Sequence, residues 1–128
     1  MNLTMASVMH LHLKYRLWIA EMNADINVLR IFNDYAHWLK TYSSNKDVEE
    51  RLRLYEQHFS ELRKDLDVLR HEMHITKMKL AALSKKEDIS LQEVKDDIKH
   101  QACKERYEAF REKFAAIKKE FKKLGAGI

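Results

Sequence analysis

The amino-acid sequence predicts an all-α protein, a single domain over residues 1–128 folded as an elongated antiparallel three-helix bundle. Three observations support this prediction. The chain contains no proline and only two glycines, both near the C-terminus, so helix-interrupting residues are scarce. Apolar residues recur in steps of three and four, the spacing of coiled-coil-like packing. Only two short polar segments break this pattern, and loops that short place neighbouring helices antiparallel, in an up-down-up order.

The first predicted helix, residues 5–42, is the most apolar of the three. Its principal row alternates steps of four and three and has one charged member: Leu11, Tyr15, Trp18, Met22, Asp25, Leu29, Phe32, Ala36 and Leu39. A second apolar row flanks the first: Leu17, Ala24, Val28, Ile31, Tyr35, Trp38 and Tyr42. An ordinary surface helix has one apolar arc of roughly 100°. The two rows together exceed what two neighbouring helices would cover.

The second predicted helix, residues 46–84, carries one unbroken apolar row. Its members are Val48, Leu52, Tyr55, Phe59, Leu62, Leu66, Leu69, Met73, Thr76, Leu80 and Leu83. Ser44 or Asn45 can cap its N-terminus, and acidic residues in the first turn suit the helix dipole. The outer face alternates in charge, for example Glu49 with Arg53, which is typical of a solvated face.

The third predicted helix, residues 90–124, begins at Ser90, which forms an S-x-x-E capping box with Glu93. Its apolar row keeps regular steps between Ala102 and Phe110 only if Arg106 is a member. That irregularity predicts a stutter, a local change of supercoil. Gly125 is the expected C-terminal cap.

Two charged residues stand in otherwise apolar rows. Matching the helices by their rise per residue places Asp25 and Arg106 within about one turn of the same level. A lone charge in a core is costly, so we expect a buried Asp25–Arg106 ion pair that fixes helix register. The alternative is that both side chains reach water at the edge of the bundle.

Four histidines fall near one level of the bundle: His12, His71, His74 and His100. His71 and His74 are three residues apart on one helix, a spacing that can chelate a metal. They lie outside the apolar row, and the sequence around them falls one residue short of H-E-x-x-H. We therefore expect no metal and no cofactor, and keep His71 and His74 only as candidates.

The C-terminal part of the third helix is basic. Its candidate patch for nucleic acid consists of Arg111, Lys118, Lys119, Lys122 and Lys123. Glutamates interrupt it, and the interleaved phenylalanines belong to the apolar row, where they are unavailable for base stacking.

The chemistry of catalysis and of export is not evident in the sequence. No glycine-rich phosphate loop, paired-cysteine zinc spacing or nucleophile elbow occurs, so we expect a non-enzymatic protein. Cys103 is the only cysteine, which excludes an intramolecular disulfide. The N-terminus is a poor signal peptide, and no charge-free run of roughly 18 residues suggests a membrane span. A cytoplasmic protein is the resulting expectation.

The excess apolar surface of the first helix carries the functional prediction. We expect an interaction or scaffold module that forms a homodimer or binds a helical partner. Its predicted surface comprises Leu17, Val28, Ile31, Tyr35 and Trp38. The alternative explanation is that the first helix is wedged deeply between the other two. Two other functional classes are a nucleic-acid-associated protein using the basic patch and a helical metal or redox protein using the histidines.

Overall fold

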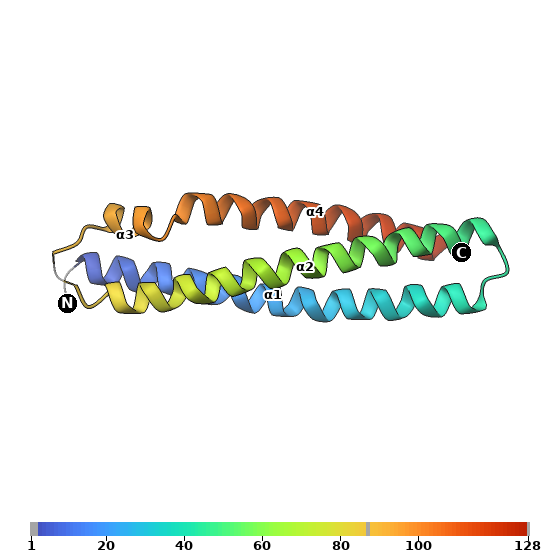
Figure 1. Ribbon diagram of the computed structural model, residues 1–128, viewed down its shortest axis with the longest axis horizontal. Coiled ribbons are helices and arrows are strands. Elements are labelled where there is room, and N and C mark those ends of the chain that lie inside the picture. Colours follow the sequence, from blue (N-terminus) through green and yellow to red (C-terminus); the bar gives the residue numbers. More distant parts are fainter. Residues whose placement is uncertain (1–2, 87, 128) are drawn as a thin grey trace.

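The computed structural model describes residues 3–86 and 88–127, with side chains from residue 5 onward. All of its regular structure is helical, which confirms the predicted fold class. It has four helices where the sequence predicts three: α1 (Leu3–Tyr42), α2 (Lys46–Leu83), α3 (Leu91–Asp97) and α4 (His100–Gly127) (Figure 1). The described helices include none that is long and apolar enough to cross a membrane.

Helices α1 and α2 form a long antiparallel hairpin. Asn45 ends the connecting loop and caps α2, its side chain accepting hydrogen bonds from the backbone N–H of Asp47 at 2.9 Å and Val48 at 3.4 Å. Helix α4 runs back along this hairpin, and α3 lies beside the end that holds the N-terminus (Figure 1). The result is a rod whose three lengthwise rows are α1, α2 and the α3–α4 pair.

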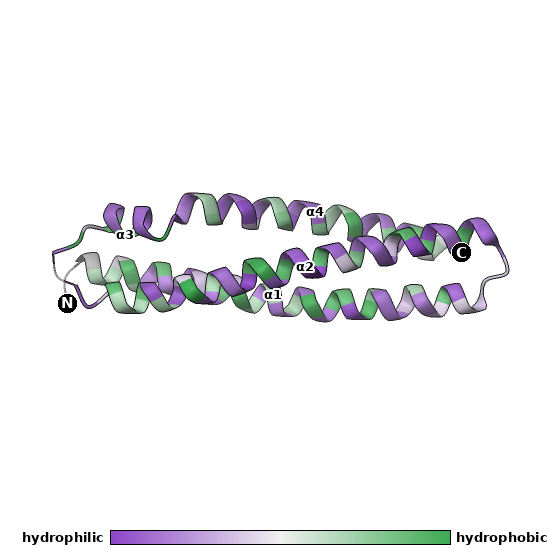
Figure 2. Cartoon of the chain, in the orientation of Figure 1, coloured by the Kyte–Doolittle hydropathy of each residue, from purple (hydrophilic) through white to green (hydrophobic). Residues whose placement is uncertain are grey.

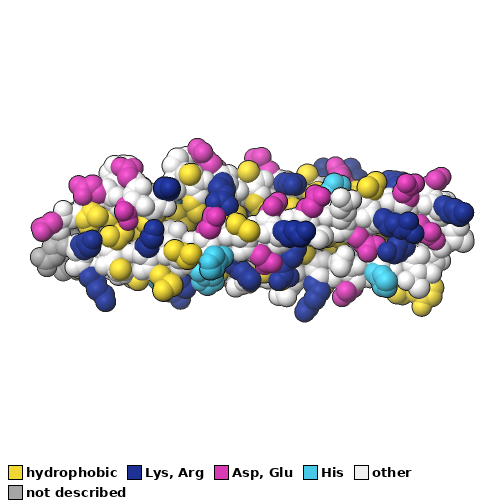
Figure 3. Space-filling view, viewed as in Figure 1, with side chains coloured by type: hydrophobic (Ala, Val, Ile, Leu, Met, Phe, Trp, Pro, Cys, Tyr) yellow, Lys and Arg dark blue, Asp and Glu magenta, His cyan; other side chains and the backbone are white. Residues whose placement is uncertain are grey.

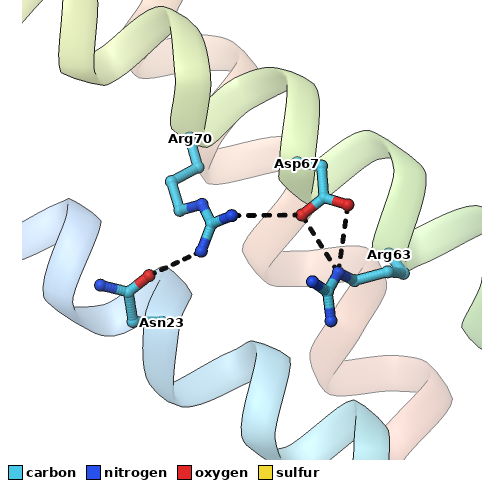
Figure 4. Close-up of polar contacts among 4 residues, drawn as sticks. All are labelled: Asn23, Arg63, Asp67 and Arg70. Atoms are coloured by element: carbon cyan, nitrogen blue, oxygen red, sulfur yellow. Dashed lines mark hydrogen bonds and ion pairs between the residues drawn. The ribbon is translucent and has the colours of Figure 1, made fainter.

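Polar contacts between α1 and α2 lie along the surface of the hairpin. Arg70 of α2 donates to the Asn23 side chain of α1 at 2.9 Å. The same guanidinium lies 3.5 Å from Asp67, which also accepts from Nε of Arg63 at 3.0 and 3.1 Å (Figure 4). Lys40 and Glu56 form a further ion pair at 2.8 Å. These contacts lie at or near the surface, where ion pairs contribute little, so they orient the helices more than they stabilise the fold.

The predicted third helix is two helices. Ser90 caps α3 as predicted, accepting from the backbone N–H of Glu93 at 3.2 Å. Helix α3 then ends at Asp97, and Lys99 takes a left-handed backbone conformation with φ of 54°. The break shifts the helical phase of the residues that follow it. The buried row of α4 therefore passes through Cys103 and Tyr107 instead of Ala102 and Arg106, and the predicted stutter is wrong.

The buried core runs the length of the rod and draws on every helix. It is largely aliphatic along α2, where Leu52, Leu62, Leu66 and Met73 are fully enclosed. Aromatic rings gather at the end that holds the α1–α2 loop, around Phe121, whose ring centre lies 5.0 Å from that of Phe59 and 5.2 Å from that of Phe32. Hydrophobic residues also recur along the whole of α1, whereas hydrophilic residues predominate on α4 (Figure 2).

Asp25 is buried, as predicted, but its partner is not Arg106. Arg111 of α4 donates to Asp25 and also lies 3.2 Å from Glu21. Arg106 instead pairs with Glu72 of α2, and both of those side chains are about half exposed. The cause is the phase shift at Lys99, which turns Arg106 away from α1 and brings Arg111, five residues later, to face it.

The C-terminal cap predicted at Gly125 is also wrong, because α4 continues to Gly127. Gly125 lies inside the helix, where the Tyr35 ring packs directly on it. A Cβ at position 125 would lie 3.1 Å from Cε1 of Tyr35. The missing side chain therefore makes room for an aromatic ring of α1.

Candidate functional site

A continuous line of apolar side chains follows the outside of α1. We call it the α1 stripe, and its members are Met9, Leu13, Leu17, Ala20, Ala24, Val28, Ile31, Tyr35, Trp38 and Tyr42. Every member is exposed except Val28, which is half-buried. Leu17 is 60%, Ile31 58%, Trp38 55% and Tyr42 73% exposed. Large hydrophobic side chains are seldom left so open in such a long row on a soluble monomer.

The α1 stripe lies on the face of the helix opposite the core. Each residue advances the helix by about 100°, so two positions correspond to about 200°. The buried residues Tyr15, Met22, Leu29 and Ala36 are each followed two positions later by a stripe member. The two apolar faces of α1 are thus separate: one packs on α2 and α4, and the other has no covering element in the described chain.

Three aromatic rings at one end of the α1 stripe are already ordered against one another. The Tyr35 and Trp38 ring centres lie 6.2 Å apart with nearly parallel planes, and those of Trp38 and Tyr42 lie 5.0 Å apart. Tyr35 also meets the core, edge-on to Phe121 at 6.0 Å. Rings held in this way lose little rotamer freedom when they are covered, which lowers the cost of binding.

All five residues predicted for the partner surface lie on the α1 stripe. Leu17, Ile31, Tyr35 and Trp38 are exposed and Val28 is half-buried, so deep wedging of this face between α2 and α4 does not occur. The stripe extends further toward the N-terminus than the predicted surface, chiefly through Met9 and Leu13. The step of four from Leu13 to Leu17 is a signal that could have revealed it.

The exposed hydrophobic side chains of α2 are arranged differently from those of α1. Helix α2 also exposes large hydrophobic side chains, Leu54, Val68, Ile75 and Met78. Charged residues such as Glu61 and Asp65 separate the first two of these along the helix. The exposed hydrophobic residues of α2 therefore do not form a continuous line.

The candidate histidines and three of the five candidate basic residues lie exposed on the surface. His71 and His74 are exposed, and no group of three or more His, Cys, Asp or Glu side chains in the described chain is arranged to hold a metal. In the basic patch, Arg111 is engaged by Asp25 and Glu21, and Lys118 lies 4.7 Å over the Phe114 ring. Lys119, Lys122 and Lys123 remain exposed. On the face drawn in Figure 3, basic and acidic side chains are interspersed along the rod.

His100 is the one buried histidine among the described residues. Its Nδ1 lies 2.9 Å from the Tyr15 hydroxyl, and its ring stacks on Trp18 with centres 6.1 Å apart. Burial lowers the pKa of His100, and the nearby cations Lys14, Lys95 and Lys104 lower it further. A neutral imidazole whose Nδ1 accepts a hydrogen bond from the Tyr15 hydroxyl is the state consistent with this environment.

Burial also raises the pKa of the Cys103 thiol, although its contact with the Tyr15 hydroxyl opposes the rise. A thiol of raised pKa is a poor nucleophile, so this buried cluster has the character of a core.

Comparison with known proteins finds no family model, no curated protein and no solved structure that matches the chain.

Proposed function

We propose that this chain is a non-enzymatic interaction module that binds another helix along the α1 stripe. The rod of long helices, packed in the manner of a coiled coil, serves as the scaffold that holds the stripe straight. The partner is either a second copy or a helical segment of another protein. The observation that carries the proposal is the unbroken run of exposed apolar side chains on the side of α1 away from the core.

The geometry favours a helix as the bound element. From residue 24 onward the stripe advances in alternating steps of four and three, which is the pattern that receives the side chains of a second helix. Over residues 9–42 it extends about 50 Å at 1.5 Å per residue. A small molecule would cover little of such a line, whereas an amphipathic helix laid lengthwise would cover all of it.

A photo-crosslinking experiment in cells tests the proposal. A photoreactive phenylalanine analogue is placed at position 31 or 38 of the α1 stripe, and at position 54 of α2 as the control, because Leu54 is 54% exposed. Adducts at positions 31 and 38 that are absent at 54, and that mass spectrometry maps to a helical segment, are expected. No adducts from the stripe, or equal yields at all three positions, would contradict the proposed function.

A further inference from the structure

We propose that the partner of the α1 stripe is a second copy of this chain, laid antiparallel along it, with the two α1 helices related by a two-fold axis near residues 25 and 26. This inference rests on the proposed function and names the partner. In that arrangement residue n faces approximately residue 51 or 52 minus n of the second copy, by the uniform rise of a helix.

Side-chain sizes along the stripe are complementary in this register. The aliphatic residues Met9, Leu13 and Leu17 come opposite the aromatic Tyr42, Trp38 and Tyr35 of the second copy. The small Ala20 and Ala24 come opposite the β-branched Ile31 and Val28. Large side chains thus meet smaller ones from end to end, which is the condition for close packing between two surfaces.

A parallel arrangement lacks this complementarity. It would set Trp38 against Trp38 and Tyr42 against Tyr42 at one end. In the middle it would set Ala20 and Ala24 against themselves. The bulky end would hold the helices apart while the alanines left a gap, and such voids cost free energy. The size pattern therefore favours the antiparallel pair.

Charges beside the stripe agree with the same register. Arg16 and Asp34 are 18 residues apart, which is five full turns, so they lie on the same flank of α1. A two-fold axis between antiparallel helices brings like flanks together, and Arg16 then lies level with Asp34 of the second copy. Both side chains are exposed, and within the described chain neither forms an ion pair. Each is therefore open to a partner across the interface.

The apolar area is sufficient for a stable dimer. At roughly 200 Å² for a large side chain, the exposed fractions of the seven large stripe members leave on the order of 700 Å² per chain. Two chains would bury about 1,400 Å² together, within the usual range for specific interfaces of roughly 1,200–2,000 Å². The contact is isologous, so each copy covers the stripe of the other and association stops at two.

Sedimentation equilibrium across a range of concentrations tests whether the partner is a second copy. We expect a mass of about twice the 15.3 kDa of one chain. Ile31→Lys should weaken the dimer about a hundredfold or more, because the charge enters the centre of the interface twice. Leu54→Lys on α2 is the matched control and should leave the mass unchanged. A chain that stays at 15.3 kDa at every concentration overturns the dimer, while stripe adducts to another helical protein would leave the proposed function standing.

Disulfide formation tests the orientation. In a Cys103→Ala background, Leu13→Cys and Trp38→Cys are made in separate chains. Positions 13 and 38 are about 37 Å apart along α1, so in an antiparallel dimer each variant alone should stay unlinked, whereas an equal mixture should form a 13–38 disulfide dimer on oxidation. Disulfide dimers within each variant alone would show a parallel arrangement and overturn the proposal.

A charge exchange tests the register. Asp34→Arg should weaken the dimer several-fold because two arginines then face each other, and adding Arg16→Asp should restore the affinity. Failure of the second substitution to restore it would overturn the proposed Arg16–Asp34 contact.

Discussion

At the scale of single residues, Asp25 shows what the sequence can predict about the partner of a buried charge. A carboxylate in the apolar row of α1 requires a cationic partner, and in the structure that partner is Arg111. The identity of that cation depends on the phase of α4. Arg106 and Arg111 differ by five residues, or about 140° around the helix, and the sequence does not reveal which of them faces α1.

The two arginines should differ sharply in their contribution to stability. Arg111→Met leaves the Asp25 carboxylate, whose side chain is only 7% exposed, without its partner, and should lower the free energy of unfolding by about 3 kcal/mol. Arg106→Met breaks a half-exposed pair and should cost less than about 1 kcal/mol. Urea unfolding of both variants measures the difference.

The double variant Asp25→Leu with Arg111→Met is the control for this comparison. It removes the unpaired charge as well as its partner, and it should recover most of the lost stability. Equal losses in the two single variants would show that Asp25 is not paired with Arg111 in solution.

At the scale of elements, the ends of α1 and α2 were predictable because they are set by local chemistry. The polar loop and the Asn45 cap fix them, and the predicted boundaries of residues 42 and 46 agree with the structure. The break between α3 and α4 was not predictable in this way. Lysine has no preference for the left-handed region, so nothing at position 99 distinguishes a turn from a helix. Only the packing of His100 and Cys103 against α1 requires a break in the helix at this point.

Glycine substitutions test this break. Lys99→Gly should stabilise the protein by about 0.5–1 kcal/mol, because glycine adopts a positive φ without the strain of an L side chain. Lys95→Gly, inside α3, should destabilise it by a similar amount through the low helix propensity of glycine. The midpoint of urea unfolding measures both. If the two substitutions destabilise equally, then residues 90–124 form one continuous helix after all.

At the scale of the whole molecule, the rod arises because α1, α2 and the α3–α4 pair each have an apolar face that packs lengthwise on the others. Helix α1 carries a second apolar face outside this core. The presence of a second face on α1 could be read from spacing alone, as residues such as Leu17 and Ile31 show. The sequence does not show whether α2 or α4 covers this second face, because the coverage depends on how deeply α1 sits between them. The structure leaves this face open, and the same arrangement encloses His100 against Tyr15 and Trp18 on the core side of α1.

The enclosure of His100 should make the stability of the molecule depend on pH. Burial lowers the pKa of His100, and burial together with nearby cations also lowers the pKa values of His12 and His74. In the unfolded chain these groups protonate near the ordinary value of 6.5, so below that pH the unfolded state binds more protons. Stability should be fully present above pH 6.5 and should fall as the pH drops further.

Urea unfolding at a series of pH values from neutral to mildly acidic measures this dependence, in a range where carboxylates remain charged. His100→Gln should flatten the fall in stability below pH 6.5, because the side chain that resists protonation in the folded state is gone. His37→Gln, at an exposed position near the other end of α1, is the matched control and should retain the wild-type slope. An unchanged slope in His100→Gln would mean that the imidazole is not held neutral against Tyr15 in the folded protein.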